Sequence, residues 1–254
     1  MAAAAAGRTA APDPADAGAD PGGTTVISGI LPAEVVSMES TTDMDDLFPQ
    51  EAALIARAVE KRRLEFATVR WCARKALADL GYPAGPILPG PKNEPLWPDG
   101  VIGSLTHCDG YRAAAVARAG RLAAIGIDAE PHRELPGGVL AMVARPEEIP
   151  ALAELRTRYP ATHWDKVLFS AKESVYKAWF PLARRWLDFQ DATLRFDPRE
   201  QTFVAELHQV GPVVGGTALS RMSGRFTVGG GLVVTSVVVE GGAGDAAVRR
   251  APAL

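Results

Sequence analysis

Alternation of apolar and polar side chains predicts a strand at residues 124–131. Successive side chains of a strand point to opposite faces, so apolar residues at every second position share one face. That face consists of Ile125, Ile127 and Ala129. Asp128 and Glu130 fall on the opposite face, where Gly126 leaves room beside them. Two carboxylates at this spacing can bind one hard cation through oxygen.

A helical period predicts a helix at residues 164–179. At about 100° per residue, the large apolar side chains of this segment fall on one stripe. The stripe consists of Trp164, Leu168, Ala171, Val175 and Trp179. Glu173 and Lys177 lie opposite the stripe, one turn apart. The helix therefore buries one face, presents a carboxylate and an ammonium group on the other, and is expected to break near Pro181.

The same patterns place the remaining elements. A short strand from Val101 is expected to end in a polar bend at Thr106 and His107, and a second strand to reach the turn at Ala119 and Gly120. The strand 124–131 follows directly, so a hairpin would bring His107 close to the acidic pair. Helices are expected within 49–80, most clearly at 63–77, and between 135 and 160. Further strands are expected at 26–31, 192–196, 202–207, 224–228 and 232–239. A loop is expected at 85–100.

These elements predict an α+β fold, because each half of the chain combines helices with a few strands that alternate like an antiparallel sheet with one wet face. The expected boundaries are a disordered tail at 1–23, a first α+β half at 24–131, a second at 132–240 and a flexible tail at 241–254. The first tail is rich in Ala, Pro, Asp and Gly and has few side chains to bury.

Composition excludes several classes of protein. The 254 residues are 47% hydrophobic, enough for a sizeable core, and the net charge of −3 offers no global field for nucleic acid. The two cysteines and four histidines show no disulfide or zinc spacing. The longest apolar stretch is too short to span a membrane, and the Ala-rich N-terminus lacks the features of a signal peptide. We therefore expect a soluble, cytoplasmic protein. We also expect a monomer.

The strand and the helix together supply three carboxylates and a lysine, namely Asp128, Glu130, Glu173 and Lys177. This set suits Mg²⁺, or Mn²⁺ in its place, and a substrate that carries phosphate. Structural alternatives stay open at this point. An Asp-x-Glu sequence is commonly a solvated strand edge, and a Glu–Lys pair on a helix is commonly exposed. Likewise, the arginines of the helix at 63–77 fit a solvated face, and His107 fits a structural hydrogen bond.

Three motifs in order give the chain a family resemblance. They are Gly103–Cys108, Ile125–Glu130 and Phe169–Ala178, reinforced by Arg70–Arg74 and Trp97–Gly100. The chain resembles the Sfp/EntD-type 4′-phosphopantetheinyl transferases over roughly residues 25 to 240, and within them the bacterial EntD-like branch. One departure is Asn93, where the family often has Gly.

The resemblance implies two similar α+β halves related by a pseudo-twofold axis, with the active site in the cleft between them. It implies Mg²⁺-dependent transfer of the 4′-phosphopantetheine group of coenzyme A (CoA) to a serine of an apo acyl or peptidyl carrier protein. Adenosine 3′,5′-bisphosphate is the other product. The carriers would belong to fatty-acid, polyketide or nonribosomal-peptide synthases.

The resemblance also implies roles for individual residues. Asp128, Glu130 and Glu173 would hold the metal, with the Ala129 carbonyl orienting a bound water. Glu173 would also be the general base, and Lys177 would neutralise a phosphate oxygen. The CoA-binding residues would be Arg62, Arg70, Lys92, Thr106, His107, Asp128, Glu173 and Lys177.

Two other classes of function fit the residues less well. A Mg²⁺-dependent phosphohydrolase of a CoA-like or nucleotide substrate would use water in place of the carrier serine. The arginine-rich helix and the lysine loop favour a long polyphosphate ligand such as CoA instead. A non-catalytic carrier-binding or CoA-binding module would not need all three acidic positions.

Overall fold

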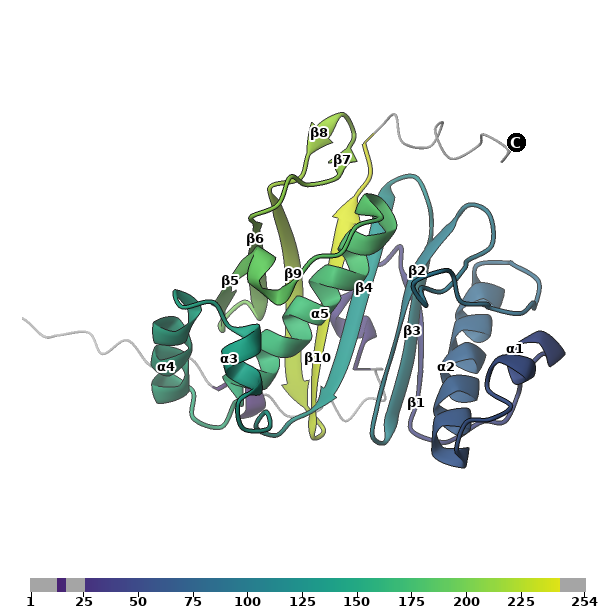
Figure 1. Ribbon diagram of the computed structural model, residues 1–254, viewed down its shortest axis with the longest axis horizontal. Coiled ribbons are helices and arrows are strands. Elements are labelled where there is room, and N and C mark those ends of the chain that lie inside the picture. Colours follow the sequence, from purple (N-terminus) through teal and green to yellow (C-terminus); the bar gives the residue numbers. More distant parts are fainter. Residues whose placement is uncertain (1–12, 17–25, 243–254) are drawn as a thin grey trace, which may run out of the picture.

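The computed structural model describes residues 13–16 and 26–242, and it has the α+β architecture that the sequence predicts (Figure 1). A three-stranded antiparallel sheet has the order β1-β3-β2, a five-stranded antiparallel sheet has the order β4-β10-β9-β6-β5, and β7 and β8 pair separately. The strands are β1 (Val36–Ser40), β2 (Val101–Cys108), β3 (Tyr111–Arg118), β4 (Leu122–Pro131), β5 (Ala192–Asp197), β6 (Thr202–Leu207), β7 (Val213–Val214), β8 (Thr217–Ala218), β9 (Arg221–Gly229) and β10 (Leu232–Glu240). The helices are α1 (Pro49–Leu54), α2 (Glu60–Asp79), α3 (Val139–Val143), α4 (Glu148–Arg158) and α5 (Trp164–Ala183), with 3₁₀ turns η1 (Pro14–Asp16), η2 (Ser28–Ile30) and η3 (Phe189–Asp191).

One long helix covers a face of each main sheet. Helix α2 packs small side chains, including Cys72 and Ala76, against Ala114 and Val116 of β3. It ends at Asp79, and Gly81, two residues later, adopts a left-handed φ of 84° that favours glycine. None of the helices in the described residues is long and apolar enough to cross a bilayer.

Helix α5 covers the large sheet with the stripe that its periodicity predicts. All five stripe residues are buried in one core with side chains of β9 and β10. The expected break near Pro181 is confirmed, because the helix ends at Ala183, two residues after the proline, where Arg184 is left-handed, at φ 51°. A proline in the last turn removes one hydrogen bond without preventing the turn from closing.

Strand β4 is the edge strand of the large sheet and lies next to β2 of the small sheet. It pairs with β10, with Asp128 opposite Thr235, so the predicted hairpin with the preceding strand is wrong. Strand β2 still lies beside β4, and side chains connect them: the N–H groups of Ile127 and Ala129 donate to Ser104 Oγ at 3.1 Å and to Thr106 Oγ1 at 3.0 Å. The strand that the sequence placed in the first half is thus hydrogen-bonded into the sheet of the second half.

Two further local predictions are wrong. Residues 26–31 form the turn η2 instead of a strand, and the first strand is β1. Thr106 and His107 do not form a bend, because β2 runs straight through them to Cys108 and turns at Gly110, whose φ of 75° a glycine adopts without strain.

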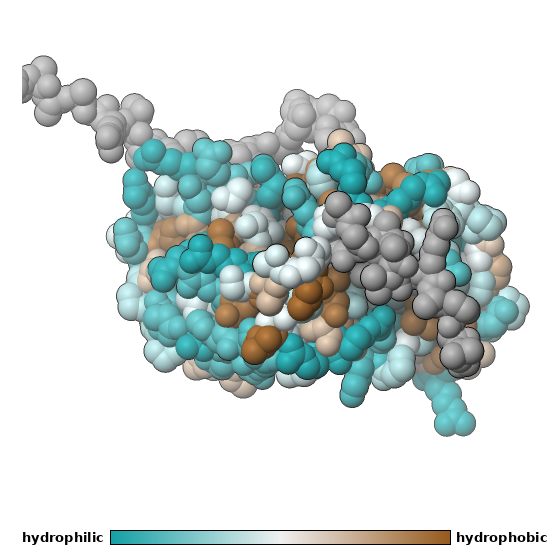
Figure 2. All heavy atoms as spheres, turned by 90° about the horizontal axis from the view of Figure 1, so that it is seen from above, coloured by the Kyte–Doolittle hydropathy of each residue, from teal (hydrophilic) through white to brown (hydrophobic). Residues whose placement is uncertain are grey.

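The predicted tails fall mostly on residues 1–12, 17–25 and 243–254, which lie outside the described residues. Residues 13–16 differ from the predicted disorder. Pro14–Asp16 form η1, and the Asp13 carboxylate just before it accepts hydrogen bonds from Ala161 N–H and Thr162 Oγ1. Seen from above, the end of the molecule at which α5 finishes is mainly hydrophilic, with apolar side chains gathered near its centre (Figure 2).

Candidate active site

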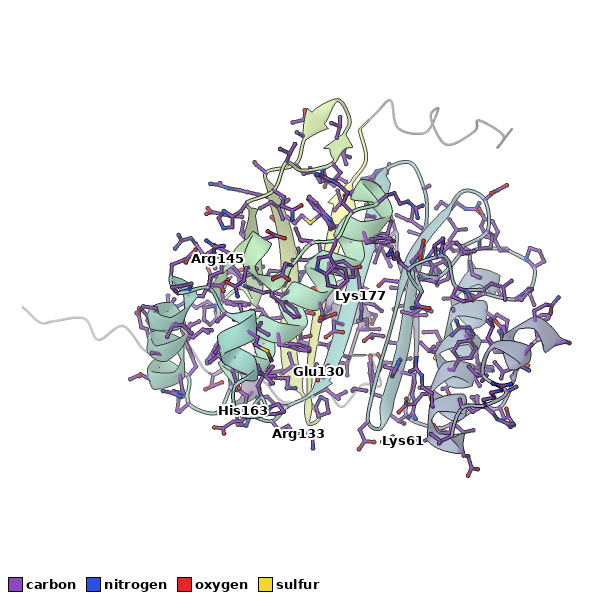
Figure 3. The ribbon with its side chains drawn as sticks, viewed as in Figure 1. Lys61, Glu130, Arg133, Arg145, His163 and Lys177 are labelled. Carbon is purple, nitrogen blue, oxygen red and sulfur yellow. The ribbon has the colours of Figure 1, made fainter. Side chains whose placement is uncertain are left out.

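The close approach of α5 to β4 depends on Gly126. A Cβ atom at this position would lie 1.9 Å from the carbonyl oxygen of Ser174 and 2.6 Å from the nitrogen of Ala178. The helix backbone therefore rests directly on the strand. Asp128 and Glu130 share the face of Gly126, so their carboxylates meet the polar side chains of α5. Figure 3 shows Lys177 and Glu130 one below the other where α5 and β4 meet.

Asp128 is buried and uses only one of its carboxylate oxygens. Its Oδ1 accepts a hydrogen bond from Lys177 Nζ at 2.8 Å and another from Thr106 Oγ1 at 3.4 Å. Lys177 also donates to the carbonyl of Ile127 at 3.0 Å. The second oxygen, Oδ2, is buried and has no hydrogen-bond partner among the described residues. A buried carboxylate oxygen is normally paired, so this oxygen is available to a ligand.

Lys166 is a member of this group that the sequence patterns missed. Its ammonium lies 3.0 Å from Glu130 Oε2, at the other end of the acidic face of β4. Lys166 lies roughly two helical turns before Glu173, so both fall on the side of α5 that faces β4. That spacing is the sequence signal that could have identified it.

Glu173 faces the acidic pair. Burial is the main cause that raises the pKa of its carboxyl group above the ordinary value, followed by the charge of Asp128, while Lys177 opposes the shift. No hydrogen bond or ion pair engages the Glu173 carboxylate within residues 13–16 and 26–242. Glu173 also lines a cavity of about 160 Å³ with Tyr176, Trp186 and Phe189. It therefore lies between the acidic strand on one side and an open pocket on the other.

A polar group connects helix α2 to strand β2 of the small sheet. Arg62 Nη1 lies 2.8 Å from His107 Nε2, and Glu65 Oε2 is 3.7 Å from each of these two side chains. Burial, and then the charge of Arg62, lowers the pKa of His107. The His107 ring is therefore neutral at pH 7, and Lys177 is close enough to contribute to the same shift.

Arg70 is part of the fold as well as of the predicted site. Its Nε donates to the carbonyl of Ile87 at 2.9 Å, and its guanidinium carbon lies 3.2 Å from the centre of the Phe66 ring. Burial lowers the pKa of Arg70 to about 10, and the nearby Glu51 opposes the shift. Arg74, one turn later, donates to both oxygens of the fully buried Glu51 carboxylate. Neither arginine lies on the solvated face that a charge run favours.

Lys92 lies apart from these residues in an exposed loop. Within the described ranges its ammonium forms no ion pair, and its backbone N–H donates to Glu94 at 2.9 Å. The next residue, Asn93, has φ 64°, a left-handed conformation that glycine and asparagine tolerate best. This explains how Asn93 can replace the glycine that is frequent in the resembling family.

The site offers oxygen ligands, but they do not form a finished cage. Among residues 13–16 and 26–242, no group of three or more His, Cys, Asp or Glu side chains is placed to hold a metal ion. Lysines neutralise Asp128 and Glu130. Mg²⁺ usually takes only one or two protein carboxylates, together with water and substrate phosphate. Among the described residues, Asp128 Oδ2 has no hydrogen-bond partner and the Glu173 carboxylate has no hydrogen bond or ion pair, so these two groups could supply such ligands.

Comparison with known proteins decides the family. Residues 50–117 match the model of the 4′-phosphopantetheinyl transferase N-terminal domain, and residues 124–216 match that of the 4′-phosphopantetheinyl transferase superfamily. The chain belongs to the 4′-phosphopantetheinyl transferases. It is 55% identical over 226 residues to the transferase Svp of Streptomyces mobaraensis, which covers 87% of this chain and 92% of Svp.

Two further relatives have lower identity to this chain. The transferase PptT of Mycobacterium tuberculosis is 48% identical over 225 residues, which cover 85% of this chain and 98% of PptT. Enterobactin synthase component D of Escherichia coli is 32% identical over 142 residues, which cover 54% of this chain and 64% of that protein. The resemblance to the Sfp/EntD-type enzymes is thereby confirmed, with the component D proteins at lower identity.

The transferase brings most of its predicted site residues together. Contacts or charge effects connect Thr106, His107, Asp128, Glu173 and Lys177, and Arg62 joins through His107. Ala129 lies between the two acidic residues of β4, with its N–H bonded to Thr106. A cavity of about 540 Å³ between α4 and β5 involves none of the predicted residues.

Proposed function

We propose that this transferase moves the 4′-phosphopantetheine group of CoA to a serine of an apo acyl or peptidyl carrier protein and releases adenosine 3′,5′-bisphosphate. One observation carries the proposal: Glu173, with a raised pKa and no partner in the described residues, lies beside the Asp128–Lys177 pair and borders an open pocket. The carriers would belong to fatty-acid, polyketide or nonribosomal-peptide synthases.

CoA, the donor substrate, would bind through cationic side chains. Arg62 of α2 contacts His107 of β2, Thr106 precedes His107 on the same strand, and Lys92 and Arg70 would complete the adenine-side phosphate contacts. Charge-assisted donors suit these phosphates, which stay anionic throughout the reaction. Lys177 is less buried than its partner Asp128, so its ammonium can exchange the carboxylate for a phosphate oxygen.

Mg²⁺, or Mn²⁺, would be held by Asp128 and Glu173, and Glu130 and the main chain of Ala129 belong to the same group. The unpaired Oδ2 of Asp128 supports this assignment. When bound, the ion would neutralise charge on the diphosphate of CoA.

Glu173 would act as the general base toward the carrier serine. It would accept the serine hydroxyl proton as the serine oxygen bonds to the phosphorus that carries pantetheine. The bond from that phosphorus to the bridging oxygen then breaks, and adenosine 3′,5′-bisphosphate leaves with the bridging oxygen. The raised pKa of Glu173 suits a base, because a more basic carboxylate accepts a proton more readily.

The test is mass spectrometry of a panel of apo carrier proteins after incubation with CoA and Mg²⁺. Modified carrier serines are expected with the wild-type chain and are expected to be lost with Asp128→Ala. Glu200→Ala, an exposed acidic residue outside the site, is the matched control and should retain activity. Cleavage of CoA without modification of any carrier would favour a phosphohydrolase and refute the proposal.

A further inference from the structure

The loop that carries Lys92 is folded around the side chain of Glu94. Glu94 Oε2 accepts a hydrogen bond from the N–H of Lys92 at 2.9 Å, and the Glu94 carbonyl accepts another from the N–H of Gly90 at 2.7 Å. A Cβ atom at Gly90 would lie 2.5 Å from Glu94 Oε1 and 2.7 Å from Oε2, so the carboxylate packs directly on the glycine. The Glu94 side chain is only 14% exposed, although Lys92 is exposed. One carboxylate therefore fixes the main chain at the tip of this loop.

The same carboxylate connects the loop to the end of α5. Glu94 Oε1 lies 3.3 Å from Nη1 of Arg184, the left-handed residue at which α5 ends. Burial first, and then the charges of Glu173 and Glu94, raises the pKa of Tyr176 on the same helix. Glu94 comes from the loop between α2 and β2, yet it lies close to residues that line the pocket beside Glu173.

This arrangement holds the main chain of Lys92 and leaves its side chain available. Within the described residues the Lys92 ammonium forms no ion pair. A lysine that binds a phosphate loses conformational freedom, and a main chain that is already fixed reduces what remains to be ordered. The contact with the exposed Arg184 contributes less, because ion pairs at the surface are weak.

We propose that Glu94 is a positioning residue for CoA. Its carboxylate fixes the loop at Lys92 and, through Arg184, fastens the loop to the end of α5. This inference rests on the proposed function, which assigns Lys92 to the adenine-side phosphates. The sign of the effect is diagnostic, because a carboxylate near an anionic ligand also repels it. Loss of position weakens CoA binding, whereas loss of repulsion alone strengthens it.

The experiment measures the affinity of the full chain for CoA by calorimetry, with Mg²⁺ and without a carrier protein. Glu94→Ala removes both contacts of the carboxylate and should bind CoA at least about fivefold more weakly than wild type. Glu94→Gln keeps an oxygen that can accept the N–H of Lys92 and should bind no more than about twofold more weakly. Gly90→Ala keeps Glu94 but displaces its carboxylate, so its loss of affinity should match that of Glu94→Ala.

Arg184→Met tests the contact with α5. It should weaken CoA binding by about two- to threefold, and it should add nothing in the Glu94→Ala background. The matched control is Arg221→Met, which breaks another exposed ion pair of 3.3 Å, with Glu206, and should leave CoA affinity unchanged.

Lys92→Met tests whether Glu94 acts through Lys92. The variant should weaken CoA binding by itself, and in that background Glu94→Ala should cost less than about twofold more, because a loop without its ammonium gains little from being fixed. Hydrogen exchange of the Lys92 amide, followed by NMR, should be faster in Glu94→Ala and unchanged in Arg221→Met.

Wild-type or tighter CoA binding by both Glu94→Ala and Gly90→Ala would overturn the inference. Equal losses from Glu94→Ala with and without Lys92 would also overturn it, because Glu94 would then be a structural residue only. A wild-type chain that gives the expected pattern of CoA affinities but modifies no carrier would refute the proposed function alone. Absence of CoA binding by the wild type would refute both.

Discussion

Replacing Gly126 by Ala tests whether the contact between α5 and β4 assembles the site. The added Cβ would lie 1.9 Å from the carbonyl oxygen of Ser174, and ordinary contact begins at 3.4 Å, so the helix must move by about 1.5 Å. The atoms that it meets belong to the helix backbone and cannot rotate away. Overpacking of this kind costs typically 1–3 kcal/mol, and we expect about 3 kcal/mol here. For a chain of this size, that corresponds to a fall of about 6–12 °C in the unfolding midpoint.

The same displacement carries Glu173 and Lys177 away from Asp128. Lys177 Nζ is 2.8 Å from Asp128 Oδ1, so a movement of that size breaks the hydrogen bond or forces a different rotamer. A misplacement of about 1 Å can reduce the rate by about 10²-fold, and we expect a loss of that order in kcat for carrier modification.

The assay combines thermal unfolding followed by circular dichroism with single-turnover transfer to an apo carrier, at a temperature where both proteins are folded. Gly137→Ala is the matched control, because a Cβ at that exposed glycine meets nothing within 4 Å, and it should leave both measurements unchanged. A Gly126→Ala protein with the unfolding midpoint and turnover of the wild type would show that the close approach does not position the site.

Three further predictions follow from individual contacts. Glu173→Gln should lose about 10²–10⁴ in kcat and keep CoA affinity within a few fold, because Gln retains an oxygen but cannot accept the proton. Single-turnover kinetics and calorimetry measure the two quantities, and a loss of CoA affinity in step with the loss of kcat would make Glu173 only a ligand. Arg74→Met should cost about 3–5 kcal/mol in urea unfolding, because it removes the main partner of the buried Glu51 carboxylate; a loss below about 1 kcal/mol would contradict this. Because burial and Arg62 lower the pKa of His107, its ring is neutral in the free protein, and a bound phosphate would favour the imidazolium form. CoA binding near pH 6.5 should therefore take up a proton, seen as buffer-dependent heat in calorimetry and lost in His107→Gln; equal heats in buffers of different ionisation enthalpy would remove His107 from the phosphate site.

Local periodicity predicted the two elements that carry the site. The face of β4 and the stripe of α5 follow from the geometry of one strand and one helix, so a single sequence contains the information. The pairing of β4 cannot be predicted from local periodicity, because its partner β10 lies about a hundred residues further along the chain. A short connection favoured a hairpin with β3, whereas burial of the Val-rich β10 between β4 and β9 decided the sheet order.

Charged residues were harder to assign than apolar ones. Arg70 could be read as a phosphate ligand or as part of a solvated helix face, and its burial against Phe66 and Ile87 fits neither interpretation alone. The buried carboxylate of Glu51 on α1 explains this burial of Arg70. The position of Glu51 depends in turn on where that short helix packs. Lys166 was missed for the same reason, since its importance comes from Glu130, which lies on a different element.

Strand β4 shows why fold and chemistry are difficult to separate in this chain. Its odd-numbered residues Ile125, Ile127 and Ala129 pack into the core beneath the small sheet, and its even-numbered residues Gly126, Asp128 and Glu130 meet α5. A slip of one residue in its pairing with β10 would exchange the two faces. The carboxylates would then enter an apolar core and isoleucine would meet Lys177, so the same register that buries the strand also aligns Asp128 with the helix. Changes that loosen this register, such as a proline at Ile127, should therefore remove activity and stability together, whereas changes confined to the polar face, such as Asp128→Ala, should remove activity while the fold survives.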